Sequence, residues 1–104
     1  MPIITSPQNG AQVGPATRVE GRASPDALVV IQTEVYDQTT GKFVKMVPGI
    51  RHRPEADGTF SLLVSTPKVS FGTKNPMRYE IHVFTARADG FESQHAIVTV
   101  DQAP

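Results

Sequence analysis

The segment RPEADGTFSLLV, which begins at Arg53, carries acidic residues and a glycine at spacings that resemble a calcium-binding loop. An EF-hand loop aligned on its invariant glycine at Gly58 would place Glu55 and Asp57 at ligand positions. The same alignment puts Arg53 at the first ligand position and Val64 at the twelfth, where a bidentate glutamate is needed. Because a cation would meet a positive charge and lack its closing ligand, the sequence predicts a turn at Asp57-Gly58 instead. This turn is expected to be a hairpin reversal that leads into a strand.

Two of the three histidines could also take part in metal chemistry. His82 and His95 flank the turn signal Asp89-Gly90, so a suitable strand register would bring their rings close together. Imidazole is a common zinc ligand, but two histidines without a third ligand make a poor zinc site. We therefore expect both side chains to face solvent from strand positions, and we expect no metal ion and no cofactor.

Catalytic motifs are missing from the sequence. It contains no G-x-S-x-G elbow, no phosphate-binding P-loop and no G-x-G-x-x-G fingerprint. No two of its ten Asp and Glu residues have a spacing that suggests a general acid and base, although strands can bring distant carboxylates together. We therefore expect that the protein is not an enzyme, and the sequence assigns no catalytic residue.

Positive charge is concentrated in the middle of a chain whose formal net charge is zero. Residues 38–79 contain seven Lys and Arg against two acidic residues, a net charge of +5, so the rest of the chain carries −5. The sequence predicts a basic surface formed by five side chains: Lys42, Lys45, Arg51, His52 and Arg53. One explanation is an anionic partner, such as an acidic polysaccharide, a lipid headgroup or an acidic protein surface. The other is that edge-strand charges discourage edge-to-edge aggregation.

Nucleic acid is not expected as the partner of this basic surface. The stretch KFVKMVPGIRHR contains a single aromatic residue, Phe43, whereas single-stranded nucleic acids are bound by stacking of their bases on several aromatic side chains. The overall charge balance also lacks the basic excess of nucleic-acid-binding domains.

Apolar and polar residues alternate with a period of two, which is the pattern of half-buried β-strands. The clearest runs are residues 16–23, 27–36, 58–66, 77–84 and 95–101, and shorter candidates are 2–5, 42–47 and 50–53. The alternation predicts that Phe60, Ile81 and Val98 are buried together. No stretch shows convincing helical periodicity.

Turn signals separate these runs. They are Asn9-Gly10, Pro25-Asp26, Thr40-Gly41, Pro48-Gly49, Asp57-Gly58, residues 71–76 and Asp89-Gly90. About seven strands with reversals between them predict an all-β fold, an antiparallel β-sandwich or barrel.

The length of 104 residues predicts one domain, residues 1–104, and the final residues 101–104 are expected to begin a linker. The chain has no cysteine, so disulfides and thiolate chemistry are excluded. No stretch approaches the ~20 apolar residues of a membrane span. The first residues, MPIITSPQNG, lack the basic and apolar regions of a signal peptide, so any export signal is expected elsewhere in a longer polypeptide.

Short motifs spread over nearly the whole chain resemble those of bacterial immunoglobulin-like domains, a group that includes fibronectin-III-like modules. The segments are ITSPQNGAQV, VEGRASPDALVVI, EADGTFSLLV, YEIHVFTARADGFES and IVTV. The matching positions are Ser6-Pro7, Asn9-Gly10, Gly21, the step from Ala56 to Phe60, Tyr79 and Asp89-Gly90. The resemblance implies a Greek-key, Ig-like β-sandwich of about seven strands.

The chain departs from antibody-type domains in its core. It has neither the disulfide nor the tryptophan of those domains, and Ile81 stands where the second cysteine would be. The core is therefore expected to be held by aliphatic packing. Tyr79 is expected either to form a tyrosine corner or to be an ordinary core tyrosine.

The resemblance implies a non-catalytic module of a larger bacterial envelope or secreted protein, located outside the cell or in the cell envelope. Such a module would space or dock neighbouring domains of the same polypeptide. The alternatives are a module that binds carbohydrate or an anionic surface polymer, and an accessory domain of a secreted hydrolase.

Overall fold

The computed structural model describes residues 2–68 and 75–104, and these residues form eight β-strands without any helix. The strands are β1 (Ile3–Ser6), β2 (Gln12–Val13), β3 (Ala16–Arg22), β4 (Leu28–Asp37), β5 (Phe43–His52), β6 (Thr59–Ser65), β7 (Met77–Ala86) and β8 (Ala96–Gln102). In this part of the chain, no helix is long and apolar enough to cross a membrane. The all-β prediction is confirmed.

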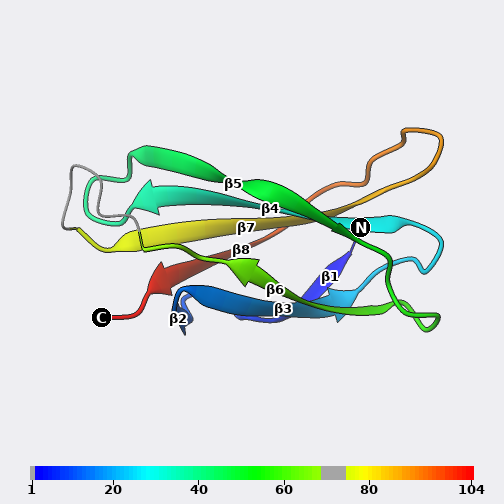
Figure 1. The fold of residues 1–104 in the computed structure, drawn as a ribbon, viewed down its shortest axis with the longest axis horizontal. Coiled ribbons are helices and arrows are strands. Elements are labelled where there is room, and N and C mark those ends of the chain that lie inside the picture. Colours follow the sequence, from blue (N-terminus) through cyan, green and yellow to red (C-terminus); the bar gives the residue numbers. More distant parts are fainter. Residues whose placement is uncertain (1, 69–74) are drawn as a thin grey trace.

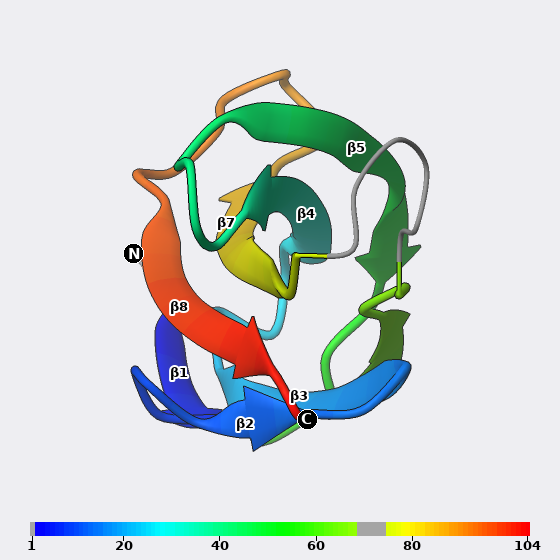
Figure 2. The same cartoon turned by 90° about the vertical axis from the view of Figure 1, so that its left-hand side faces the viewer.

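The strands form two sheets that pack face to face as a sandwich (Figure 1). One sheet has three strands in the order β1-β3-β6, and the other has five in the order β2-β8-β7-β4-β5. All pairs of neighbouring strands are antiparallel except β2 and β8, which are parallel. Seen along the long axis, the edges of the larger sheet curve toward the smaller one (Figure 2). We call the face of the five-stranded sheet that is turned away from the smaller sheet the outer face.

The core lies between the sheets and follows the predicted alternation. Phe60, Ile81 and Val98 expose 4% or less of their surface and belong to one hydrophobic cluster, so the prediction that they are buried together is confirmed. Val19 and Gly21 of β3 are buried as well. A Cβ at Gly21 would lie 2.0 Å from the carbonyl oxygen of Ile3, so only glycine lets β1 pass this close to β3.

Strand β5 runs without interruption through Pro48 and Gly49, where the sequence predicts a turn between two short strands. That prediction is wrong. Because β5 lies at the end of the strand order, with β4 as its one paired strand among the described residues, the missing N–H of proline can be tolerated. The register of the β4–β5 pair shifts between Ile31 and Thr33, so the extra residue of β5 is absorbed in a β-bulge.

The Asp57-Gly58 turn is confirmed, but it is not a hairpin. Asp57 Oδ1 accepts hydrogen bonds from the hydroxyl and the backbone N–H of Thr59, at 2.7 and 3.0 Å, and these bonds lower the pKa of the Asp57 carboxyl. Gly58 has a φ of 86°, and a Cβ there would lie 2.5 Å from the carbonyl oxygen of Ala23. Because β5 and β6 belong to different sheets, the turn carries the chain from one layer of the sandwich to the other.

The other turn predictions have mixed outcomes. Glycines at three of the remaining signals, Gly10, Gly41 and Gly90, have the positive φ that such reversals require. Pro25-Asp26 also lies in a turn. Of the signal at 71–76, residues 71–74 lie outside the described part of the chain.

Strand pairing near the two chain ends extends beyond the predicted strands. Strand β2 was not predicted, because two residues are too short for any alternation to show. Strand β8 includes Asp101, the last residue of the predicted run 95–101, and continues through Gln102, although residues 101–104 are expected to begin a linker. These residues pair with β2, and the N–H of Ala103 donates to the carbonyl oxygen of Val13 at 2.9 Å.

Tyr79 on β7 is fully buried, and its hydroxyl donates to the carbonyl oxygen of Pro67 at 2.6 Å. Burial raises the pKa of Tyr79 to about 12. A tyrosine corner bonds the backbone a few residues upstream, whereas Pro67 lies twelve residues upstream. Tyr79 is therefore a core tyrosine whose polar end is satisfied by a longer-range backbone contact.

Candidate functional site

The five residues predicted to form a basic surface lie on or beside β5, the strand at one end of the five-stranded sheet. Lys42 precedes the strand and Arg53 follows it, and both are exposed. Lys45 and His52 are paired with core residues of β4, so their side chains belong to the inner face of the sheet. Arg51 is paired with a residue of the outer face. The five side chains therefore line an edge from both sides and do not gather on one face.

Mixed charge surrounds one end of this edge. His52 lines an open hollow together with Glu20, Arg22 and Glu55. Among residues 2–68 and 75–104, ion pairs join Arg78 to Asp101 and His82 to two glutamates, and none includes the five basic residues. We call Lys42, Lys45, Arg51, His52 and Arg53 the basic edge, and its role in binding stays a prediction.

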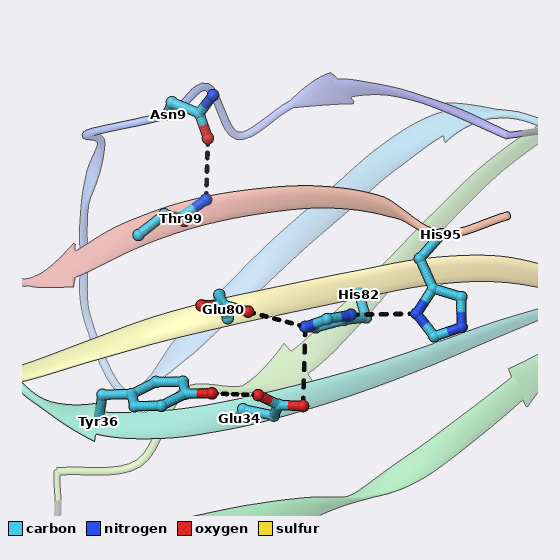
Figure 3. A network of polar contacts seen from close by, with 7 residues as sticks. All are labelled: Asn9, Glu34, Tyr36, Glu80, His82, His95 and Thr99. Atoms are coloured by element: carbon cyan, nitrogen blue, oxygen red, sulfur yellow. Dashed lines mark hydrogen bonds and ion pairs between the residues drawn. The ribbon is translucent and has the colours of Figure 1, made fainter. Parts of the chain in front are cut away.

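A second set of polar side chains lies near the middle of the outer face. Glu34 on β4 and Glu80 on β7 are directly opposite each other across the two strands. His82 follows Glu80 by two residues on the same face, and His95, immediately before β8, reaches its ring (Figure 3). We call Glu34, Glu80, His82 and His95 the glutamate–histidine cluster.

The imidazole of His82 occupies the centre of the cluster. Its Nε2 lies 3.0 Å from Glu80 Oε1 and 3.7 Å from Glu34 Oε1. Its Nδ1 lies 3.1 Å from His95 Nδ1. The ligand atoms of Glu34, Glu80 and His82 all lie within 4.8 Å of one another. Three groups that can each bind a cation therefore converge on one point from two strands.

The cluster is partly shielded from water. The side chain of His82 is 14% exposed, that of Glu34 24% and that of Glu80 36%. The ring of His95 stacks on Phe84, with centroids 4.3 Å apart and planes at 6°. This stacking holds His95 in place although the residue itself is exposed.

Negative charge dominates the cluster. Two carboxylates opposite each other on one sheet face repel, unless a positive group lies between them. The Tyr36 hydroxyl donates a hydrogen bond to Glu34 Oε2. This bond, desolvation and the nearby negative charges of Glu80 and Glu34 together raise the pKa of Tyr36 to about 12. The arrangement thus presents a site that attracts a cation.

Beside the cluster, the backbone of β8 is hydrogen-bonded to the loop before β2 at Thr99. Asn9 Oδ1 accepts a hydrogen bond from the N–H of Thr99 on β8 at 2.9 Å (Figure 3). The N–H of Gly10 donates to the carbonyl oxygen of Thr99 at 2.8 Å. Thr99 is paired with Glu80 on β7. The loop before β2 therefore secures the strand that borders the cluster.

Sequence reasoning found the histidines of the cluster but missed its glutamates. The strand register brings His82 and His95 together, which the sequence alone left open, and the side chain of His82 is only 14% exposed, unlike the solvent-facing position expected for it. Glu80 lies on the outward parity of its strand together with His82, which is visible in the sequence. Glu34 comes from a strand more than forty residues away, so only the pairing of β4 with β7 reveals it.

Comparison of the chain with protein-family models, curated proteins and solved structures finds no match. What the molecule does must therefore be inferred from its own side chains and their geometry.

Proposed function

We propose that this chain is a non-catalytic, immunoglobulin-like module of a larger envelope or secreted bacterial protein, which spaces or docks neighbouring domains. The strand order supports this proposal. Strands β1 and β2 can be counted as one split first strand. The smaller sheet then consists of β1, β3 and β6, which are the first, second and fifth strands. The third, fourth, sixth and seventh strands, which are β4, β5, β7 and β8, form most of the larger sheet. Immunoglobulin sandwiches likewise keep their first, second and fifth strands in one sheet and their third, sixth and seventh in the other. The fourth strand, β5, lies in the larger sheet here.

The shape of the molecule carries the spacer role. Its principal extents are 42, 23 and 16 Å, and the two chain ends lie toward opposite ends of the long axis (Figure 1). An elongated body with its ends apart would separate the domains that flank it.

An antibody raised against the chain tests this role in the source organism. We expect the antibody to label intact cells or their culture medium, and to detect a polypeptide much larger than the 11.3 kDa of this chain. Detection only after lysis, as a free chain of that size, would refute the proposal.

Binding of an anionic surface polymer is the second candidate function. It is favoured by one observation: Lys42, Lys45, Arg51 and Arg53 are all exposed along the free edge of the larger sheet. Contacts through exposed charges weaken with salt, because such charges are screened within ~8 Å at physiological ionic strength.

Binding to acidic and neutral glycans at low and high salt tests this candidate, together with a variant in which Lys45, Arg51 and Arg53 are replaced by Glu. We expect binding to acidic glycans only, lost at high salt and in the variant. Binding to a neutral glycan that survives both changes would move the site away from the basic edge.

A further inference from the structure

We propose that the glutamate–histidine cluster is a binding site for a divalent transition-metal ion of the zinc class, with Glu34, Glu80 and His82 as ligands. Zinc bonds of about 2.0–2.2 Å to oxygen and nitrogen imply about 3.4 Å between neighbouring ligand atoms of a tetrahedron. The distances from His82 Nε2 to the two carboxylates, 3.0 and 3.7 Å, lie on either side of this value. All three ligand atoms lie within 4.8 Å of one another, so rotation of the two glutamate side chains toward a common point would complete the geometry.

The donor set selects the kind of ion. Calcium and magnesium prefer all-oxygen ligands, whereas an imidazole nitrogen suits zinc, copper, nickel or iron. Three protein ligands leave a fourth tetrahedral position. Because the cluster lies on the outer face of the sheet, this position is open to solvent and takes a water molecule.

The partners of the ligands fit this role. A metal-bound histidine usually donates its second N–H to an acceptor that fixes the ring. With the metal on His82 Nε2, its Nδ1–H donates to the neutral Nδ1 of His95, 3.1 Å away. Glu34 is held through its other oxygen, Oε2, by the Tyr36 hydroxyl. His95 and Tyr36 are therefore positioning residues rather than ligands.

Charge also favours a cation at this point. Glu34 and Glu80 are opposite each other, and the neighbouring residues on the flanking strands are the neutral Met46 and Thr99. Arg78, the next cation along β7, is paired with Asp101 at 3.0 Å. A divalent ion would offset the repulsion between the carboxylates. This inference is independent of the proposed module function.

Titration of the untagged protein with Zn²⁺ in a buffer without chelating components tests the site. Calorimetry gives the affinity, and nuclear magnetic resonance of the histidine rings gives the position. We expect one Zn²⁺ per chain, with shifts of the His82 and His95 rings and none of the His52 ring. Calcium at millimolar concentration should not displace the ion.

Substitutions distinguish the residues of the cluster from a histidine outside it. Glu80→Gln and His82→Gln should each weaken binding at least tenfold, and His95→Gln should weaken it about 10- to 100-fold, as other outer partners of metal ligands do. His52→Gln is the matched control, because this histidine lies on β5 away from the cluster, and it should leave the affinity unchanged. Glu80 is partly exposed, so Glu80→Gln is the variant least expected to disturb folding.

Three results would overturn the proposal. The first is the absence of saturable Zn²⁺ binding. The second is an affinity that Glu80→Gln and His82→Gln leave unchanged in variants whose spectra show a folded protein. The third is an equal loss of affinity in His52→Gln, which would place the ion elsewhere.

Discussion

The basic edge and the glutamate–histidine cluster are two polar regions of the same sheet, and they are built in opposite ways. The basic edge comes from one continuous stretch around β5, and its side chains point to both faces of an edge strand. The cluster collects residues from β4, β7 and the position immediately before β8, with contacts of 3.0–3.7 Å. In the basic edge, residues adjacent in the sequence are dispersed over two faces. In the cluster, residues far apart in the sequence are brought together.

The difference shows why charge along a β-strand is a weak guide to a binding site. Successive side chains alternate between faces, so a run of like charges on one strand is divided in two. Cross-strand pairing instead places residues of separate strands at about 4.5–5.5 Å between Cβ atoms. A site on a sheet is therefore assembled by register rather than by local sequence.

The largest expected effect concerns the core on which both regions depend. Phe60→Ala should lower the free energy of unfolding by roughly 3–5 kcal/mol, because Phe60 is 3% exposed and truncation leaves a cavity. Urea denaturation followed by circular dichroism measures this change. Leu63→Ala on the same strand is the control, since Leu63 is 58% exposed and should matter little. Equal midpoints for Phe60→Ala and the wild type would show that the two sheets do not form one core.

A smaller loss of stability is expected from a substitution on the inner side of β7, the strand that carries Glu80 and His82. Tyr79→Phe removes the hydrogen bond to Pro67 and should cost about 0.5–1.5 kcal/mol. The pKa of Tyr79 is raised from 10.0 to about 12 in the folded protein. The contribution of the protonated Tyr79 hydroxyl to the free energy of unfolding is therefore complete below pH 10 and is lost as the pH rises toward 12.

Unfolding measured across this range should thus show a steeper alkaline loss of stability in the wild type than in Tyr79→Phe. Parallel pH profiles for the two proteins would contradict the buried position of this hydroxyl.

More of the fold than of the glutamate–histidine cluster could be predicted from the sequence. Alternation in the sequence located five long strands and the core residues Phe60, Ile81 and Val98, because burial on one face of a strand leaves a local pattern. The unbroken β5 was missed because proline and glycine, ordinarily turn residues, are tolerated in a bulged edge strand. Glu34 was missed because no local pattern encodes which strand lies next to β7.

The smallest expected effect on stability concerns the basic edge. Replacement of Lys45 and Arg51 by Thr should change the free energy of unfolding by less than about 0.5 kcal/mol, because both side chains are exposed. If their charges protect the edge, this neutral variant should self-associate, whereas a variant with Glu at both positions should stay monomeric. Analytical ultracentrifugation distinguishes these cases. A neutral variant that stays monomeric at high concentration would exclude the protective role.

The central claim is that β4 and β7 pair in the register that places Glu34 opposite Glu80. Nuclear Overhauser effects between the two strands test it most directly, without any ligand. We expect cross-strand backbone contacts that match Thr33 with Ile81 and Glu34 with Glu80, and a contact between the rings of His82 and His95. Contacts shifted by one residue would place Glu80 opposite a core position of β4, and would contradict both the sheet and the cluster.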